Sequence, residues 1–244
     1  MEPILVVLIC ATAAALVAAL GVLPLIGREE VPGRWLGWSN AAAAGMMLAA
    51  TFVLADAGVA DATLSFGFGA LLGIAFIHAS RAFSGTKELA LNQLHEASLA
   101  YGYEVLLVSS LHSAAEGIAI GALMAVDLSA GIFVTVALAL HNMPEATLLA
   151  AVFRSRGVSM RRTAALAVIS NASQVLMAVS TFAILEAAPV ALPWALGIAA
   201  GAVLYLVMID LLPESYRQAG PTSIALVTIL AMGAFALIRG AGTP

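Results

Sequence analysis

Apolar residues in this chain fall into eight runs of about 20 residues, separated by short stretches rich in glycine, proline and charged residues. A helix needs about 20 consecutive, mostly apolar residues to cross the hydrocarbon core of a bilayer. Each run is therefore predicted to form one membrane-spanning helix. The predicted spans are residues 4–26, 38–58, 64–84, 101–125, 130–153, 162–186, 190–213 and 222–240. The predicted fold class is all-α integral membrane, with residues 1–244 forming a single transmembrane domain.

The composition supports this interpretation. Hydrophobic residues make up 62% of the 244 residues and charged residues only 10%, and the mean hydropathy is +1.04. A soluble domain carries about a quarter charged residues, so this chain has too few polar side chains to cover a surface that faces water. The lipid bilayer is its predicted surroundings.

Several features exclude other classes of protein. The net charge is −4 and no basic cluster is present, which argues against a nucleic-acid partner. A single cysteine, Cys10, excludes an internal disulfide and a cysteine-based zinc motif. The first apolar run has no basic residue before Arg28 and exceeds the apolar region of a signal peptide, about 7–15 residues, so it is predicted to be a span.

Positive charges indicate how the spans are oriented. Of the ten Lys and Arg residues, nine lie at or after the ends of spans 1, 3, 5 and 7, and the loops after spans 2, 4 and 6 contain none. The positive-inside rule therefore places the odd loops in the cytoplasm and both termini outside. Arg239 is the exception. The nine residues are Arg28, Arg34, Arg81, Lys87, Arg154, Arg156, Arg161, Arg162 and Arg217.

Two neighbouring spans each carry a histidine followed four residues later by a glutamate, His112 with Glu116 and His141 with Glu145. This spacing places both side chains of a pair on one helix face. All four fall near the middle of the bilayer, where ionisable side chains are costly and indicate function. Hydrogen bonds between helices are the structural alternative. Opposed faces would offer two imidazoles and two carboxylates to Zn²⁺, Fe²⁺, Mn²⁺, Co²⁺ or Cd²⁺ rather than to Ca²⁺ or Mg²⁺.

Proline and glycine residues indicate local features of the spans. Pro144 removes the hydrogen bond to the carbonyl of Leu140 and should bend the fifth span, leaving a backbone oxygen beside His141. A plain kink is the alternative. Glycines four residues apart should let neighbouring helices approach closely. These pairs are Gly69 with Gly73 and Gly117 with Gly121.

The motif His-Asn-x-Pro-Glu at 141–145, after His-x-x-x-Glu-Gly at 112–117, resembles the ZIP (Zrt/Irt-like protein) family of divalent metal transporters, with the bacterial GufA-like branch as the closer match. Residues 44–50 and 210–214 are also similar to that branch. The resemblance implies a 3+2+3 arrangement of spans with inverted three-helix repeats, alternating access, the bacterial cytoplasmic (inner) membrane and a homodimer.

The resemblance also implies ligands. The core positions match His112, Glu116, His141, Asn142 and Glu145, a thioether ligand matches Met46 or Met47, and Gln174 stands where the family often has glutamate. The chain departs from the family at Ser113 and Ala115, which replace Asn and Pro, and at Ala146, which replaces Gly. We therefore expect a less kinked fourth span and one well-formed metal position rather than two.

Three further ionisable residues lie near the predicted cytoplasmic ends of spans: Glu104, His78 and Asp210. They are candidates for an exit path along which an ion leaves the site. Interfacial side chains that reach towards water, or helix caps, are the alternatives.

The function predicted from these features is a carrier, not an enzyme, that brings a divalent metal into the cytoplasm. Zn²⁺ is the first candidate, and Cd²⁺, Fe²⁺ and Mn²⁺ are the alternatives. No nucleotide-binding motif G-x-x-x-x-G-K-[ST] occurs. An intramembrane metal-dependent hydrolase is the rival, but its usual motif His-Glu-x-x-His is absent. A metal sensor without flux is the third option.

Overall fold

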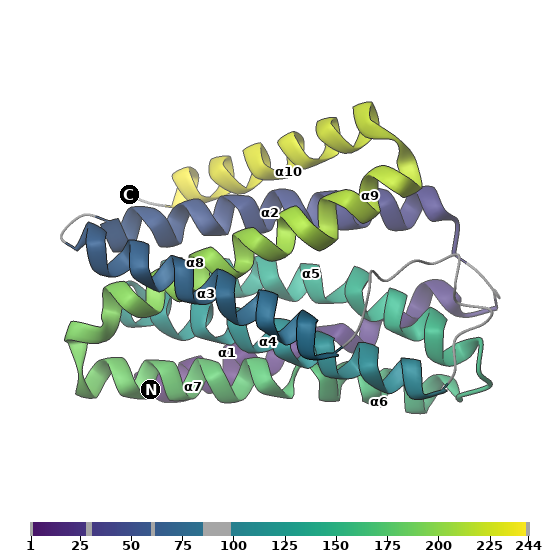
Figure 1. The fold of residues 1–244 in the computed structure, drawn as a ribbon, viewed down its shortest axis with the longest axis horizontal. Coiled ribbons are helices and arrows are strands. Elements are labelled where there is room, and N and C mark those ends of the chain that lie inside the picture. The colour runs from purple at the N-terminus through teal and green to yellow at the C-terminus, as the bar shows by residue number, and fades with distance from the viewer. Residues whose placement is uncertain (1, 28–30, 60–61, 85–98, 243–244) are drawn as a thin grey trace.

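A computed structural model describes residues 2–27, 31–59, 62–84 and 99–242, and every element in these residues is helical (Figure 1). The elements are α1 (Pro3–Val17), η1 (Ala18–Leu25), α2 (Gly33–Val59), α3 (Thr63–Ser84), α4 (Leu99–Val126), α5 (Leu128–Arg154), α6 (Met160–Ser170), α7 (Ala172–Ala187), η3 (Pro189–Ala191), α8 (Leu192–Leu206), η4 (Val207–Leu211), α9 (Leu212–Ala219) and α10 (Pro221–Gly242).

These elements form eight helical segments that are long and apolar enough to cross a membrane, which confirms the predicted number and order of spans. The segments are Pro3–Leu25, Gly33–Val59, Thr63–Ala82, Leu106–Val126, Leu128–Arg154, Met160–Ala187, Pro189–Ala219 and Pro221–Gly240. The largest difference is that the seventh segment ends six residues beyond its predicted end. The second segment begins five residues before its predicted start and the fourth five residues after.

Three of the eight spans are interrupted, which the hydropathy pattern did not predict. The first span continues as the 3₁₀ helix η1, which contains Pro24. The sixth breaks at Asn171, between α6 and α7. The seventh passes through the π-helical segment η4 before α9. The fourth span is one continuous helix, α4, and so is the fifth, α5, although it contains Pro144. The expected difference in bending between these two spans stays a prediction.

The spans pack in four close pairs: α3 along α8, α2 along α10, α4 along α7, and α5 along α1 and η1. If span 1 is matched with span 6, span 2 with span 7, span 3 with span 8 and span 4 with span 5, the α3–α8 pair corresponds to the α2–α10 pair. The α4–α7 pair then corresponds to the pair that α5 makes with α1 and η1. Inverted three-helix repeats would produce this pattern.

Glycine allows close contact in each pair, because a Cβ atom there would collide with a carbonyl oxygen of the partner helix. The predicted pairs Gly69 with Gly73 and Gly117 with Gly121 are among these contacts. The colliding groups are Gly73 with Ile198, Gly45 with Thr228, Gly117 with Gln174 and Gly21 with Met143.

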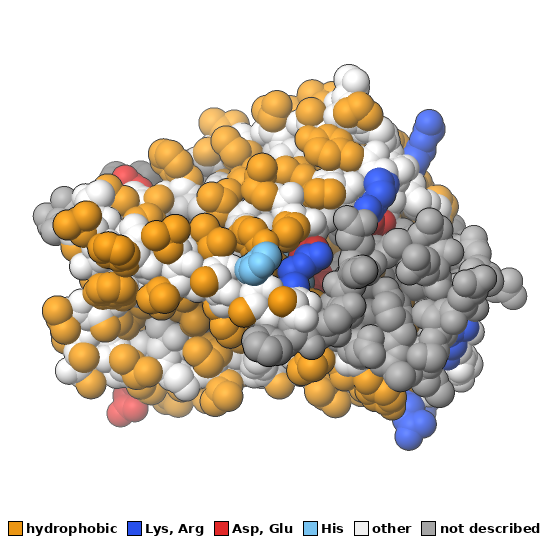
Figure 2. Space-filling view, in the orientation of Figure 1, with side chains coloured by type: hydrophobic (Ala, Val, Ile, Leu, Met, Phe, Trp, Pro, Cys, Tyr) orange, Lys and Arg blue, Asp and Glu red, His pale blue; other side chains and the backbone are white. Residues whose placement is uncertain are grey.

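The surface agrees with a membrane-spanning protein. Large hydrophobic side chains are exposed along the spans, among them Leu71 and Phe68 on α3 and Leu230 on α10. Hydrophobic side chains cover much of the visible face (Figure 2). In the same view the Lys and Arg side chains gather towards one end, and α1 begins and α10 ends towards the other (Figures 1 and 2). Both ends of the described chain therefore lie on the same side, as an even number of spans requires.

Candidate metal centre

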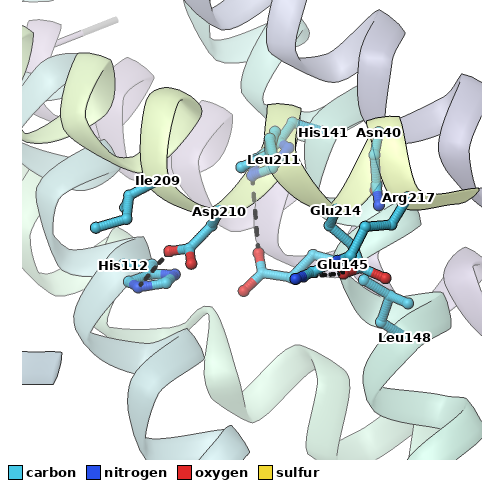
Figure 3. A pocket seen from close by; sticks show the side chains of 10 residues that line it. All are labelled: Asn40, His112, His141, Glu145, Leu148, Ile209, Asp210, Leu211, Glu214 and Arg217. Atoms are coloured by element: carbon cyan, nitrogen blue, oxygen red, sulfur yellow. Dashed lines mark hydrogen bonds and ion pairs between the residues drawn. The ribbon is translucent and has the colours of Figure 1, made fainter. Parts of the chain in front are cut away.

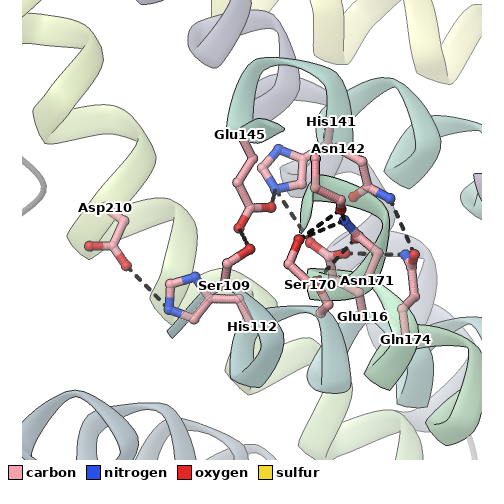
Figure 4. Close-up of polar contacts among 12 residues, drawn as sticks. Ser109, His112, Glu116, His141, Asn142, Glu145, Ser170, Asn171, Gln174 and Asp210 are labelled. Atoms are coloured by element: carbon pink, nitrogen blue, oxygen red, sulfur yellow. Dashed lines mark hydrogen bonds and ion pairs between the residues drawn. The ribbon is translucent and has the colours of Figure 1, made fainter. Parts of the chain in front are cut away.

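The α4 and α5 helices run antiparallel, and their polar faces meet inside the bundle (Figure 4). Nε2 of His141 lies 3.3 Å from Oε1 of Glu116 and 3.9 Å from Oε2 of Glu145. One potential ligand atom from each of these three residues lies within 4.8 Å of the other two. Glu116 is 1% exposed and His141 6% exposed, so an imidazole and a carboxylate face each other where water is nearly excluded.

Several potential ligand atoms in this region have no hydrogen-bond partner among the described residues, although each is buried. They are Oε1 of Glu116, Nδ1 of His141 and Oδ1 of Asn142. Buried polar atoms in proteins are almost always hydrogen-bonded, and a group of exceptions calls for an explanation such as an ion. The chemistry of these donors, two carboxylates with imidazole and amide groups, fits a divalent transition metal.

Gln174 connects two of these residues. Its Nε2 donates to Oε2 of Glu116 over 3.2 Å, and its Oε1 accepts from Nδ2 of Asn142 over 3.2 Å. Nδ2 of Asn142 also donates to the carbonyl of Ala14. Both polar atoms of Gln174 are thus used in orienting Glu116 and Asn142, each of which keeps one oxygen without a hydrogen bond in the described residues. In this arrangement Gln174 positions candidate ligands and does not offer an atom of its own.

Two serines on α4 make hydrogen bonds near the cluster, and sequence reasoning missed their roles. Oγ of Ser109 donates to Oε1 of Glu145 over 2.7 Å. Oγ of Ser113 donates to Oδ1 of Asn171, the residue at the break between α6 and α7, over 3.1 Å. Ser109 precedes His112 by three residues and so shares its helix face, which is the signal that could have identified it.

His112 lies beside the three-residue cluster and not within it. Its Nε2 lies 3.8 Å from Oδ2 of Asp210, and neither atom makes a hydrogen bond within the described chain. The expectation that all four His and Glu side chains meet at one point thus differs from the structure, which brings three together. Four residues correspond to about 6 Å along a helix, so His112 lies one turn before Glu116 on α4.

A pocket joins the two positions. His112, His141, Glu145 and Asp210 line it, together with residues of α2, α5, η4 and α9, and it has about 80 Å³ of space for water-sized molecules (Figure 3). One water molecule needs about 10–15 Å³ of such space, so the pocket has room for an ion with a few waters. The pocket therefore connects His141 and Glu145 of the cluster with His112 and Asp210.

The remaining candidates lie elsewhere. Met47 is buried in the largest hydrophobic cluster and Met46 packs against that cluster, so a thioether ligand stays a prediction. His78 is exposed, and its Nδ1 lies 2.9 Å from the hydroxyl of Tyr205, outside the pocket. Glu104 falls in α4, but its side chain lies outside the described residues. Of the two exit-path candidates whose side chains the structure describes, Asp210 lines the pocket and His78 does not.

Comparison with known proteins identifies the family. Residues 83–238 match the family model described as ZIP Zinc transporter, and this match covers more than half of the chain. The chain belongs to the ZIP family. It is therefore an integral membrane protein of a metal-transporter family, and the GufA-like branch stays a prediction.

Two curated relatives carry related names. The chain is 32% identical over 217 residues to "Putative zinc transporter At3g08650" of Arabidopsis thaliana, an alignment that covers 87% of this chain and 35% of the relative. It is also 32% identical over 149 residues to "Zinc transporter ZIP5" of Homo sapiens, covering 61% of this chain and 27% of the relative. This ZIP chain thus spans about a third of the length of these relatives.

Proposed function

We propose that this ZIP protein carries a divalent transition metal, with Zn²⁺ as the first candidate, across the membrane through the Glu116, His141 and Glu145 cluster. The observation that carries the proposal is the meeting of these ligand atoms, with unpartnered buried atoms beside them, inside a bundle of apolar spans. Two carboxylates can neutralise a divalent ion, which lowers the cost of holding charge away from water.

The donor set limits the ion. Imidazole nitrogen with carboxylate oxygen suits Zn²⁺, Cd²⁺, Fe²⁺ and Mn²⁺, and Ca²⁺ and Mg²⁺ prefer oxygen alone. The group contains no thiolate, and a carrier must hold its ion weakly enough to let it go. Gln174 supplies an uncharged amide and Ser113 is engaged by Asn171, which favours one metal position.

The position of the pocket supports transport towards the cytoplasm. Its lining includes Arg217, whose side chain is 46% exposed and which lies in the last turn of α9, at the end of the seventh span. The Lys and Arg side chains on the visible face gather towards one end of the bundle (Figure 2). On the other side of the cluster, Ile120, Leu123 and Leu138 are fully buried in the largest hydrophobic cluster. If the basic end faces the cytoplasm, this arrangement corresponds to the inward-open state of an alternating-access cycle, and an ion would leave past His112 and Asp210.

Uptake of radioactive zinc into proteoliposomes tests the proposal. Wild-type protein should show saturable uptake, and His141→Ala and Glu145→Ala should each reduce it by at least about tenfold, because each removes one ligand. Thr228→Val on α10, far along the chain from the ligands, is a matched buried-polar control and should retain uptake. Saturable binding without flux would indicate a sensor, and peptide cleavage would indicate a hydrolase; either result contradicts the proposal.

A further inference from the structure

The last turn of α3 is attached to the seventh span at two points. Nδ1 of His78 lies 2.9 Å from the hydroxyl of Tyr205, and Nη1 of Arg81 forms an ion pair with Oδ1 of Asp210. His78 and Arg81 are three residues apart and therefore share a face of α3. Tyr205 and Asp210 are five residues apart, on either side of the start of η4. A π-helical turn adds a residue, so both side chains can face α3.

The two oxygens of Asp210 have different surroundings. Oδ1 is taken by Arg81, and Oδ2 lies 3.8 Å from Nε2 of His112 without a hydrogen bond in the described residues. The side chains of His112, Arg81 and Asp210 are only 14%, 16% and 23% exposed. The Asp210 carboxylate and the His112 imidazole thus face each other beside the metal cluster. The guanidinium of Arg81 already forms an ion pair with this carboxylate.

Arginine is suited to such a position. Its guanidinium stays protonated at every physiological pH, and its planar group binds a carboxylate oxygen through directed hydrogen bonds. A divalent ion that approached Asp210 would meet a carboxylate whose charge is already balanced, with one oxygen engaged. Without Arg81, Asp210 would offer an uncompensated negative charge and His112 an imidazole. Both side chains are largely buried, where the lower dielectric constant strengthens the attraction between a carboxylate and a cation.

We propose that Arg81 is a tethered counter-cation that prevents Asp210 and His112 from retaining a second metal ion beside the Glu116, His141 and Glu145 cluster. This inference rests on the proposed function. An ion that leaves the cluster passes a neutralised carboxylate and is released, because conduction requires that each position on the path bind weakly. Arg81 thereby sets how many ions the protein holds and how readily it releases them.

The test is the number of Cd²⁺ ions bound by purified full-length protein, determined by equilibrium dialysis and metal analysis, together with uptake into proteoliposomes. Wild type and Arg81→Lys should bind one ion. Arg81→Met should bind a second ion, and its uptake should fall by about tenfold or more, since removal of one member of a close charge pair changes affinity by at least this factor. Arg81→Gln, which can still donate a hydrogen bond to Asp210, should bind two ions as well and serves if Arg81→Met does not fold.

Two further variants separate this role from a purely structural one. Tyr205→Phe removes the hydrogen bond between His78 and the seventh span, and it should still bind one ion. Arg81→Met combined with Asp210→Asn removes the carboxylate that would hold the second ion, and it should return to one. The inference is overturned if wild type already binds two ions, if both Arg81→Met and Arg81→Gln bind one, or if the double variant keeps two. A wild-type protein that binds no metal would instead refute the proposed function.

Discussion

Glu116 and His141 face each other across the α4–α5 contact, with Oε1 of the glutamate 3.3 Å from Nε2 of the histidine. Because the helices are antiparallel, the glutamate of one His-x-x-x-Glu pair lies level with the histidine of the other. The cluster therefore takes a carboxylate from α4 and an imidazole and a carboxylate from α5.

Replacement of Glu116 by glutamine should weaken metal binding by at least about tenfold, because it removes one of two negative charges while conserving shape. Competition with a fluorescent zinc chelator would measure the affinity. Thr228→Val is the control and should bind like wild type. An unchanged affinity of Glu116→Gln would show that this carboxylate is not a ligand.

Gln174 allows electrostatic and structural effects to be separated. Gln174→Glu places a second carboxylate against Glu116, so the variant should unfold at a lower temperature than wild type without metal and recover when Zn²⁺ is added. Gln174→Leu leaves Oε2 of Glu116 and Nδ2 of Asn142 without this partner, at a cost of about 1–3 kcal/mol for each buried group left unpaired.

Thermal unfolding in detergent, with and without Zn²⁺, would compare the two Gln174 variants. Gln174→Leu should be destabilised in both conditions. If Zn²⁺ stabilised Gln174→Glu no more than it stabilised wild type, the negative charge at position 174 would lie out of reach of the ion.

Gly117 is predicted to be essential for the contact between α4 and α7. A Cβ atom at this position would collide with the carbonyl oxygen of Gln174, and an over-packed helix contact costs about 1–3 kcal/mol. Gly117→Val should therefore lower the unfolding temperature and also disturb Gln174, and with it metal binding. Gly233→Val on α10 is the matched control, because nothing lies within 4 Å of a Cβ atom there. Equal unfolding temperatures for the two variants would contradict this packing.

Asp127, between the fourth and fifth spans, predicts a pH dependence of stability. The Ser129 hydroxyl and the backbone N–H groups of Ala130 and Ser129 donate to its carboxylate and hold its pKa below the ordinary value of 3.8. Since the pKa is lower in the folded state, the contribution to stability is fully present above the ordinary value and is lost as the pH falls through the folded value.

Asp127→Ala should lower stability by roughly 0.5–1 kcal/mol near neutral pH, the lower part of the range for helix N-caps, because the site is exposed. Apparent unfolding midpoints of the variant and wild type, followed from pH 7 downwards, should converge below the ordinary carboxyl pKa. A difference that grew on acidification would contradict the assignment of Asp127 as an N-cap.

Hydropathy and spacing predicted much of this protein. The run lengths determined the eight spans, and the i, i+4 spacing placed each His and Glu pair on one face. Spacing along one helix does not specify how that helix is rotated or which partner each side chain meets. This is why His112, one turn from Glu116, faces Asp210 instead of joining the three-residue cluster.

The breaks in the spans were not predictable from average hydropathy, because they depend on individual residues. Asn171 interrupts the sixth span, and its side chain bonds to Ser113 on α4. The π-helical η4 precedes Pro213 and carries Asp210. Arg81 was counted as a loop charge that reports orientation, but its guanidinium lies on Asp210. Asn171 contacts Ser113 and Asp210 contacts Arg81, and both partners are distant in sequence.

X-ray absorption at the zinc edge, on purified protein loaded with one equivalent of Zn²⁺, tests the central claim most directly. We predict a first shell of nitrogen and oxygen atoms at about 2.0–2.2 Å with an imidazole signature. The imidazole signature should be lost in His141→Ala, and the shell should change in Glu116→Gln. A shell of water oxygens alone, or one that neither substitution alters, would show that the groups shared by α4 and α5 do not hold the ion.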